Sequence, residues 1–314
     1  MKKFKIKNKK FCTIILLFIA VIPTFCTSFL YKKMNSDEAI DKIINSLYTI
    51  GKDEEKKIVN KSDSILNNLN LISHTECVQT LEPEHFDELI EFVKGKNKEV
   101  YDEILVIDKN YSIVYGNNFD REVIKEKECV KSAINGQTKI TPLTKNEKVE
   151  YIEIGVPIFK EDKVIGLIYS KVNLNFLNES VISSRFIDET TESYIVDKNG
   201  VLVTESRFVP DSVGNLRVDI KKVKASIDYS KQIPYKDYRG KDVYGVYFDL
   251  PFNDWTLIVE DDHVISQKNN KEIVKIGEIM AMVEALIIAI SKKGLDSLTK
   301  SIEEGNYDEN HKKE

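Results

Sequence analysis

A hairpin pattern that occurs twice, with its matching positions offset by nearly the same number of residues, constrains the fold of this chain most strongly. The first covers Val149–Asn173, where two runs of alternating residues flank a short charged turn. A second covers 242–261. The matching positions are Gly155 and Gly245, offset by 90 (245 − 155), and the Asp-Lys-Asn triplets 108–110 and 197–199, offset by 89 (197 − 108). Coincidence between two ordinary hairpins is the weaker interpretation, so we infer a tandem duplication.

The first hairpin has one apolar face and one face of mixed chemistry. Its even-numbered residues are mostly apolar, including Ile152, Ile154, Val156, Ile158, Val164, Ile168 and Val172. In the simplest register Phe159 pairs with Lys163 across the turn. Two cross-strand pairs then form on the mixed face: Glu153 with Tyr169, and Tyr151 with Lys171. We expect the apolar face in the core and a ligand on the mixed face.

The composition and the missing motifs argue against several function classes. The net charge is −5, which indicates no large basic surface for nucleic acid. The sequence contains no G-x-S-x-G, P-loop or HExxH motif, so it favours neither an enzyme nor a cofactor-dependent protein. The triplet Asp261-Asp262-His263 is interpreted as a helix cap rather than a metal site.

The four cysteines give no metal signature, because no CxxC or His-Cys cluster is present. Cys12 and Cys26 fall in the first apolar segment, which leaves Cys77 and Cys129 for the rest of the chain. A disulfide between these two is compatible with an oxidising compartment. Two free thiols are equally compatible, since the sequence does not place them near each other.

Two apolar segments suggest attachment to a membrane. Residues 1–10 contain six lysines, and 11–31 are 21 residues without a charge, which is the length of a membrane span. A retained signal anchor with a cytoplasmic N-terminus is favoured over a cleaved signal peptide. The second segment, 272–291, contains Lys275, Glu278 and Glu284. It is interpreted as a second span, with an amphipathic helix on the membrane surface as the alternative.

Helical and β-rich patterns alternate between the two apolar segments. Apolar residues at spacings of three and four predict a long helix over about 36–75, and a shorter helical stretch covers 83–93. Strand patterns follow at 103–108 and 111–115, then a helical segment at 119–136 and a strand at 139–143 that lead into the first hairpin. The pattern predicts an α+β fold with antiparallel sheets.

Three short motifs in the second half of the chain carry a family resemblance. They are Thr204-Glu205-Ser206-Arg207-Phe208, Asp237-Tyr238-Arg239-Gly240 and Asp254-Trp255-Thr256-Leu257. With the lysine cluster, the long helix and the duplicated sheets, the chain resembles a bacterial double Cache (dCache) sensor over roughly residues 11–291. The resemblance implies a long N-terminal helix behind two tandem PAS-like antiparallel-sheet modules, flanked by two transmembrane helices.

The resemblance also implies the domain organisation and the location. A cytoplasmic N-terminus (1–10) and a first span (11–31) would precede an extracytoplasmic double Cache domain at 32–271. Its parts would be the helix at about 36–75, a distal module at about 83–178 and a proximal module at about 190–262. A second span (272–291) and a cytoplasmic segment at 292–314, similar to the start of a HAMP linker helix, would follow. No output domain is recognised, and the expected location is the cell membrane.

In double Cache sensors the distal module normally holds the ligand, on the sheet face away from the long helix. The resemblance places eight residues there: Tyr111, Tyr115, Arg121, Tyr151, Glu153, Tyr169, Lys171 and Asn173. Lys171 stands where many amino-acid-binding members carry an aspartate, so a small carboxylate or another anion is favoured. Alternatively, Glu153 and Lys171 form an ordinary cross-strand ion pair, and surface roles remain open for every residue of the set.

The expected function is therefore a membrane-bound sensor that binds a small solute, with an organic anion favoured, and signals across the membrane. In the proximal module Ser206, Arg207, Tyr238 and Arg239 are expected to stabilise the fold rather than to bind ligand. The alternative is a cell-surface interaction protein or a truncated receptor. The implied partners are a small molecule, the membrane, and either a second copy of the chain or a full-length receptor.

Overall fold

The computed structural model describes the chain in segments and divides it into two compact units. The described residues are 9–95, 99–117, 119–145, 150–181, 189–227, 233–262, 275, 277–284, 286–290, 293 and 297, with side chains from Glu38 onward. One unit is Ile43–Asp262. The other comprises Met1–Lys42 and His263–Glu314. Each unit is described by itself.

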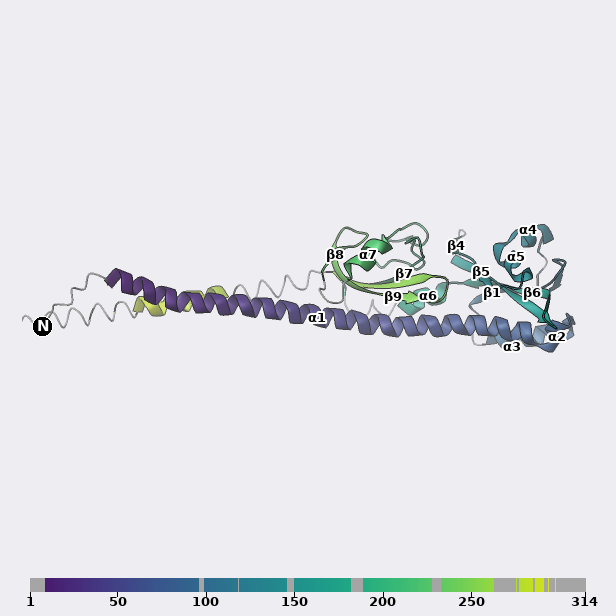
Figure 1. Ribbon diagram of the computed structural model, residues 1–314, viewed down its shortest axis with the longest axis horizontal. Coiled ribbons are helices and arrows are strands. Elements are labelled where there is room, and N and C mark those ends of the chain that lie inside the picture. Colours follow the sequence, from purple (N-terminus) through teal and green to yellow (C-terminus); the bar gives the residue numbers. More distant parts are fainter. Residues whose placement is uncertain are drawn as a thin grey trace, which may run out of the picture. The chain divides into compact units, whose positions relative to one another are not determined.

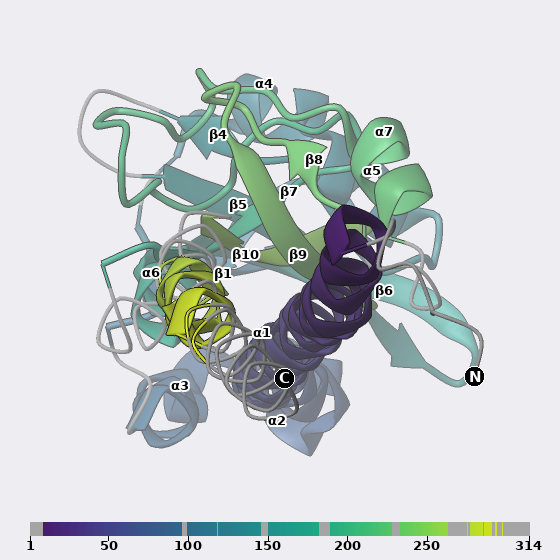
Figure 2. The same cartoon turned by 90° about the vertical axis from the view of Figure 1, so that its left-hand side faces the viewer.

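Helix α1 (Lys9–His74) confirms the predicted long helix, and its part within Ile43–Asp262 lies along one face of both sheets (Figures 1 and 2). Fully buried apolar residues recur along it at spacings of seven, four and three: Ile58, Ile65, Leu69 and Ile72. Gly51 allows the helix to approach the second sheet closely. A Cβ atom there would meet the Phe248 ring at 2.2 Å and Val259 at 3.0 Å.

The first module is a six-stranded antiparallel sheet with the order β2-β1-β6-β5-β3, and β4 also pairs with β5. The strands are β1 (Tyr101–Asp108), β2 (Ile113–Tyr115), β3 (Lys139–Ile140), β4 (Thr144–Lys145), β5 (Glu150–Lys160) and β6 (Lys163–Asn173). The predicted strand at 139–143 is thus only two residues long.

Short helices complete the first module on both faces of its sheet. After α1 come α2 (Glu76–Gln79), the 3-10 turn η1 (Pro83–His85) and α3 (Phe86–Lys94). The predicted helical segment at 119–136 consists of two helices, α4 (Arg121–Glu126) and α5 (Glu128–Ile134), which cover the sheet face opposite α1 (Figure 1). Helix α6 (Asn175–Val181) follows β6 and precedes the second module.

The predicted register of the first hairpin is wrong. Glu153 pairs with Lys171, not with Tyr169, and Tyr151 pairs with Asn173. The turn has only two residues, Glu161 and Asp162, both in the left-handed conformation with φ of 48° and 62°. It pairs Lys160 with Lys163, and the register shifts again between Ile158 and Phe159. The turn geometry and this bulge together set the register.

The second module is a four-stranded antiparallel sheet with the order β7-β10-β9-β8. Its strands are β7 (Thr191–Val196), β8 (Tyr235–Lys236), β9 (Asp242–Leu250) and β10 (Trp255–Asp262), and α7 (Ile220–Ser226) lies on the face away from α1 (Figure 1). After the Asp-Lys-Asn triplet at 197–199, Val201 and Leu202 form only isolated bridges. Asp261 and Asp262 belong to β10, so the predicted helix-capping role for them is wrong.

The same turn occurs in both modules and supports the inferred duplication. Asp108 Oδ1 accepts hydrogen bonds from the backbone N–H groups of Asn110 and Ser112, both at 2.8 Å. Asp197 Oδ1 accepts from Asn199 and Val201, also at 2.8 Å. The two Asp-Lys-Asn triplets therefore close equivalent turns between their strands.

The expected membrane spans are only partly covered by the structure. Among the described residues, no helix is long and apolar enough to cross a membrane. The side chains of 11–31, several residues of 272–291, residues 1–8 and most of 292–314 lie outside the described residues. Both spans, the cytoplasmic N-terminus and the HAMP-like segment therefore remain predictions.

Candidate functional site

A row of charged side chains crosses the first sheet on the face opposite α1. In the sheet register, Lys171 on β6 is directly opposite Glu103 on β1 and Glu153 on β5. The three residues therefore lie side by side on three neighbouring strands. Both glutamates are less than one-tenth exposed. Three charges on an otherwise apolar sheet are costly unless each is paired or meets a ligand.

Glu153 has two side-chain partners. Its Oε1 accepts hydrogen bonds from Tyr169 Oη at 2.9 Å and from Lys127 Nζ at 2.5 Å. Lys127 lies between α4 and α5, and its ammonium group also sits 5.5 Å from the Tyr169 ring centre. The backbone N–H of Glu153 donates to Thr141 Oγ1 at 2.9 Å. The carboxylate is therefore held by Tyr169 and Lys127 rather than by Lys171.

Glu103 and Lys171 are held less firmly. Glu103 Oε1 accepts one long hydrogen bond, 3.3 Å, from Asn117 Nδ2. Burial raises the pKa of Glu103, and the hydrogen bond from Asn117 and the ammonium groups of Lys171 and Lys127 only partly offset that rise. Lys171 Nζ lies 4.0 Å from Asp102 Oδ2 and 4.1 Å from the Tyr151 ring centre. The Glu103 carboxylate and the Lys171 ammonium group therefore have only long polar contacts, and each could form a stronger one.

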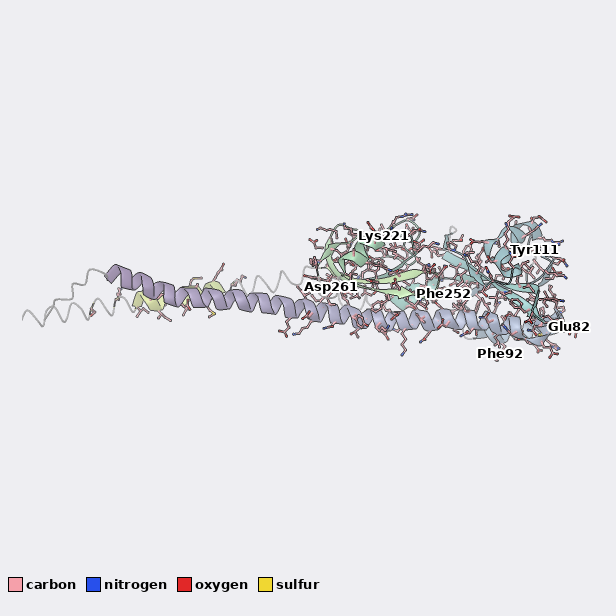
Figure 3. All side chains as sticks on the ribbon, viewed as in Figure 1. Glu82, Phe92, Tyr111, Lys221, Phe252 and Asp261 are labelled. Atoms are coloured by element: carbon pink, nitrogen blue, oxygen red, sulfur yellow. The ribbon has the colours of Figure 1, made fainter. Side chains whose placement is uncertain are left out.

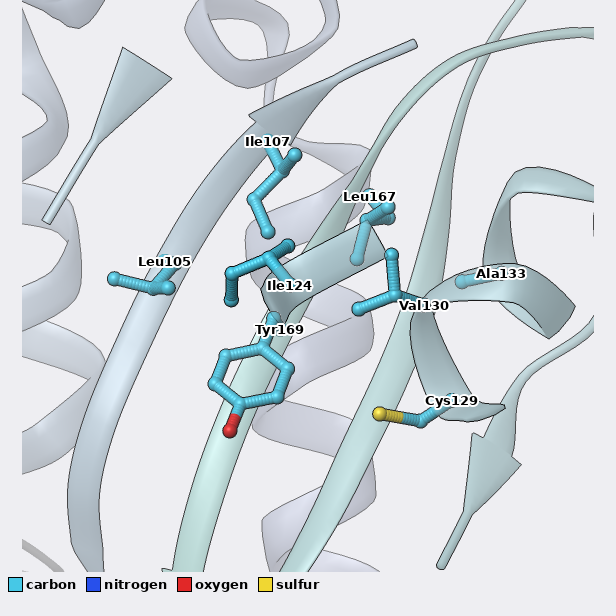
Figure 4. Close-up of a cluster of buried hydrophobic side chains, with 8 residues drawn as sticks. All are labelled: Leu105, Ile107, Ile124, Cys129, Val130, Ala133, Leu167 and Tyr169. Atoms are coloured by element: carbon cyan, nitrogen blue, oxygen red, sulfur yellow. The ribbon is translucent and has the colours of Figure 1, made fainter. Parts of the chain in front are cut away.

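An apolar cluster beneath α4 and α5 adjoins the row (Figure 4). It consists of Leu105, Ile107, Ile124, Cys129, Val130, Ala133, Leu167 and Tyr169. The Tyr169 ring lies in the cluster and its hydroxyl points away from the aliphatic side chains (Figure 4). Burial, the Glu153 charge and the hydrogen bond to Glu153 all raise the pKa of Tyr169, so its phenol stays neutral and donates.

The structure separates the eight predicted site residues into two groups. Five of them (Tyr151, Glu153, Tyr169, Lys171 and Asn173) lie on the row or beside it. Asn173 Nδ2 donates to the carbonyl oxygen of Glu99 at 2.6 Å and to Asp102 Oδ1 at 3.1 Å. It therefore holds the start of β1.

The other three predicted residues lie away from the row. Tyr111 packs at the margin of the apolar cluster, and its side chain is visible in Figure 3. Tyr115 packs edge-on against Phe86 of α3 and donates to Asp87 Oδ1 at 2.8 Å, so its predicted place on the sheet face away from the long helix is wrong. Arg121 donates to the carbonyl oxygen of Asn110 and does not reach the row. The bulge between Val106 and Ile107 explains the changed face of β2.

Four residues on or near the row were missed by the sequence interpretation: Asp102, Glu103, Asn117 and Lys127. Glu103 had a usable signal, because it is the one acid on its face of the predicted strand at 103–108, which it shares with Leu105 and Ile107. Lys127 had none, since its contact with Glu153 depends on how α4 and α5 pack.

The two cysteines of this unit are free thiols, so the Cys77–Cys129 disulfide is absent from the structure. Cys129 is buried in the apolar cluster on the α5 side, whereas Cys77 belongs to α2, directly after α1. Burial raises the pKa of Cys129 to about 12, and the charge of Glu153 contributes to the shift. The described residues contain no group of three or more potential metal ligands.

In the second module the four residues expected to stabilise the fold form a connected network. Ser206 Oγ lies 2.8 Å from Glu192 Oε1 and 2.7 Å from Tyr238 Oη. Arg207 donates to the carbonyl oxygen of Thr191 at 2.7 Å. Arg239 lies 3.9 Å from the Phe208 ring centre. The guanidinium group of this arginine therefore stacks on an aromatic ring.

Comparison with protein families matches residues 35–269 to dCache_1, the Cache domain, which accounts for most of the chain. This chain belongs to the double Cache family. The two sheets are thus its two Cache modules, and the family resemblance inferred from the sequence is confirmed. A comparison with curated proteins finds no match.

Solved structures share the double Cache fold at low sequence identity. The ligand-binding domain of PctB from Pseudomonas aeruginosa PAO1, in complex with L-Arg, is 11% identical, with a TM-score of 0.53 and coverage of 72% of this chain and 97% of that one. The domain of CtaA from Pseudomonas fluorescens with L-alanine is 13% identical, with a TM-score of 0.51 and coverage of 70% and 96%. At these identities the comparisons establish the fold.

Proposed function

We propose that this double Cache protein is a sensor that binds a small solute on the first module, at the row of Glu103, Lys171 and Glu153. The observation that carries the proposal is the incomplete pairing of Glu103 and Lys171, on the sheet face covered by α4 and α5. Glu153, which is already held by Lys127 and Tyr169, would shape the site without contacting the ligand charge.

The charges near the row favour a solute that carries both signs. Lys171 alone favours an organic anion. However, a simple anion bound to Lys171 would also lie near Glu103 and Asp102, which would repel it. A zwitterion directs its carboxylate towards Lys171 and its ammonium group towards Glu103, and so relieves the cost of burying that carboxylate. The solutes in the PctB and CtaA structures are amino acids, which have this chemistry.

The proposed output is a signal across a membrane to which the chain is anchored. The uncharged segment 11–31 and its preceding lysines support a first anchor. Exposed apolar side chains at Ile279, Met282, Leu286 and Ile290 support a second. In this proposal the two modules lie outside the cytoplasm, and the ligand shifts the equilibrium between two conformations because it binds them unequally.

Thermal-shift screening of the full chain tests the proposal. The panel contains α- and ω-amino acids, monocarboxylates and dicarboxylates, and primary amines, each at the same ionic strength. A zwitterion at one hundred times its Kd should stabilise the fold by about 2.7 kcal/mol. If only dicarboxylates stabilise the chain, the ligand is an anion rather than a zwitterion. No stabilisation by any compound would refute solute binding.

A further inference from the structure

The second sheet contains a pair of buried carboxylates that the proposed solute site does not use. Glu192 on β7 and Glu260 on β10 are directly opposite each other in the register, and each is 1% exposed. They lie on the sheet face away from α1, because the neighbouring residue Val259 faces Gly51 of that helix. Two ionised carboxylates at adjacent buried positions repel each other, so one of them is expected to hold a proton.

Hydrogen bonding distinguishes the two carboxyl groups. Glu192 Oε1 accepts from Ser206 Oγ at 2.8 Å and from the Arg207 N–H at 2.7 Å, and Oε2 accepts from Tyr238 Oη at 2.5 Å. Three donors stabilise a charged carboxylate. Glu260 Oε1 accepts from Tyr235 Oη at 2.6 Å, whereas its Oε2 is buried without a hydrogen bond. Glu260 is therefore the group that carries the proton.

The Tyr194 hydroxyl is a candidate partner for that proton. It is buried and also makes no hydrogen bond of normal geometry, although it is close enough to Glu260 for the two groups to shift each other's pKa. A protonated Oε2 of Glu260 can donate to this hydroxyl, which satisfies both atoms. When Glu260 is ionised, the Tyr194 hydroxyl can act only as a donor to it.

Other titratable groups face Glu260 from each element around it. Burial raises the pKa of Glu260 to about 8; the hydrogen bond from Tyr235 and the nearby Tyr194 hydroxyl oppose the rise, whereas the charges of Glu192 and Asp237 add to it. The remaining neighbours in the surrounding network are Arg207, Tyr238, Arg239 and Lys241, with Asp262 on the same strand. Arg239 donates to both Asp237 and Asp262, which offsets their charges at Glu260.

We propose that Glu192 and Glu260 form a proton-binding site that gives the second module an input of its own, the pH around it. When Glu260 ionises, a second negative charge lies between β7 and β10 and weakens their pairing. Strand β10 ends at Asp262, two residues beyond Glu260, where the chain leads towards the expected second span. The proton site is thus placed to act on the output end of the domain without a solute.

The pH dependence of stability follows from the raised pKa. In the unfolded chain Glu260 ionises near its ordinary value of 4.5, whereas in the folded chain it keeps its proton until about pH 8. The stabilisation that the raised pKa of Glu260 contributes to folding is therefore complete below about pH 4.5 and is lost as the pH rises to about 8. Relative to Glu260→Gln, the unfolding equilibrium constant of the wild type should rise by up to tenfold per pH unit within this window.

The test uses the full chain without added solute and compares wild type, Glu260→Gln and Asp242→Asn. Asp242 is a control on the same sheet, in an exposed pair with Lys236. Urea unfolding between pH 5 and 9, followed by the fluorescence of the single tryptophan, Trp255, gives the ratio of unfolding constants. The ratio of wild type to Glu260→Gln should change with pH as stated, whereas the ratio of wild type to Asp242→Asn should stay flat.

Infrared spectroscopy provides a second measurement that does not depend on stability. A carbonyl band of a protonated carboxyl group should be present in the wild type at pH 6.5, disappear with a midpoint near pH 8, and be missing from Glu260→Gln. A flat ratio for Glu260→Gln, or a band that this substitution does not remove, would overturn the proposal. A third outcome would also overturn the proposal. If ammonium chloride stabilises the wild type at pH 9, but sodium chloride does not and Glu260→Gln shows no such effect, the site binds a cation rather than a proton.

Discussion

At the scale of single residues, the first module depends on how each buried charge is paired. Glu153 is held by Lys127 and Tyr169, and the Lys127–Glu153 pair is less than one-fifth exposed on both sides. The pair Lys131–Glu126 on the same covering helices is at least half exposed. Buried and exposed ion pairs differ in their effect on stability, because removal of one buried partner leaves an uncompensated charge.

This difference gives a prediction for Lys127 and Lys131, which are four residues apart, one just before α5 and one within it. Lys127→Met should lower the free energy of unfolding by about 2 kcal/mol, since Glu153 loses a charge-assisted hydrogen bond. Lys131→Met should leave it essentially unchanged. Urea unfolding at pH 7 measures both. Equal effects for the two substitutions would mean that Lys127 does not hold Glu153 in solution.

The two thiols should differ in reactivity for a similar reason. Cys129 is buried and the pKa of its thiol is raised to about 12, so it should remain unmodified by a maleimide in the folded chain at pH 7.5. Cys77 is half-buried and should react. Peptide mass spectrometry distinguishes the sites, and urea should make Cys129 reactive as well. Protection of both residues that ends on reduction would instead indicate the disulfide.

Residue contacts were only partly predictable from the sequence. The mixed chemistry of the hairpin face correctly brought Glu153 and Tyr169 together, although the pairing is diagonal rather than direct. Lys127 was missed because α4 and α5 carry no local signal for their position over the sheet. Arg121 was predicted near the site because its segment was expected to cover the sheet, but the sequence does not show where the side chain points. Its guanidinium group instead donates to the carbonyl oxygen of Asn110.

At the scale of elements, periodicity predicted the helices and strands better than their pairing. The spacing of apolar residues was sufficient to find α1 up to its end at His74, and alternation found β5 and β6. The register of the hairpin required the left-handed turn at Glu161 and Asp162, a conformation that is uncommon for residues other than glycine. A charged two-residue turn without glycine or asparagine gives little signal in a sequence.

Gly155 shows how closely α5 approaches the first sheet. A Cβ atom at this position would lie 2.3 Å from the carbonyl oxygen of Cys129, which is backbone and does not move alone. Gly155→Ala should therefore displace α5 and destabilise the domain by about 1–3 kcal/mol. Chemical denaturation measures the loss, and Cys129 should at the same time react faster with maleimide. An alanine variant with unchanged stability and unchanged thiol protection would contradict this packing.

At the scale of the whole domain, a hydrogen bond joins the surroundings of the proposed solute site to the second module. Asn253, in the turn between β9 and β10, donates from Nδ2 to the carbonyl oxygen of Thr141 at 2.9 Å. Thr141 Oγ1 in turn accepts from the backbone of Glu153. The neighbouring Phe252 lies at the end of the second sheet nearest to the first (Figure 3). The turn is therefore placed to pass a change at the row to β10.

This link predicts a variant that binds but does not transmit. Asn253 has φ of 60°, so Asn253→Gly keeps the turn and removes only the amide. Asp254→Gly is the matched control, with φ of 54° and no part in the link to Thr141. In the wild type and the control, a bound amino acid should change the fluorescence of Trp255. In Asn253→Gly the same affinity should come with a much smaller change, and an undiminished change would exclude this route.

The central claim is that a small zwitterion binds to Glu103 and Lys171, and titration calorimetry tests it most directly. The amino acid that stabilises the full chain most strongly is titrated into the wild type, Glu103→Gln, Lys171→Met and Lys139→Met. Lys139 is the control, because it lies on the same sheet in an exposed pair with Glu128. We predict saturable binding to the wild type and the control, and at least tenfold weaker binding to the other two, which is about 1.4 kcal/mol. Equal affinity in all four proteins, or no heat of binding in any, would contradict the account.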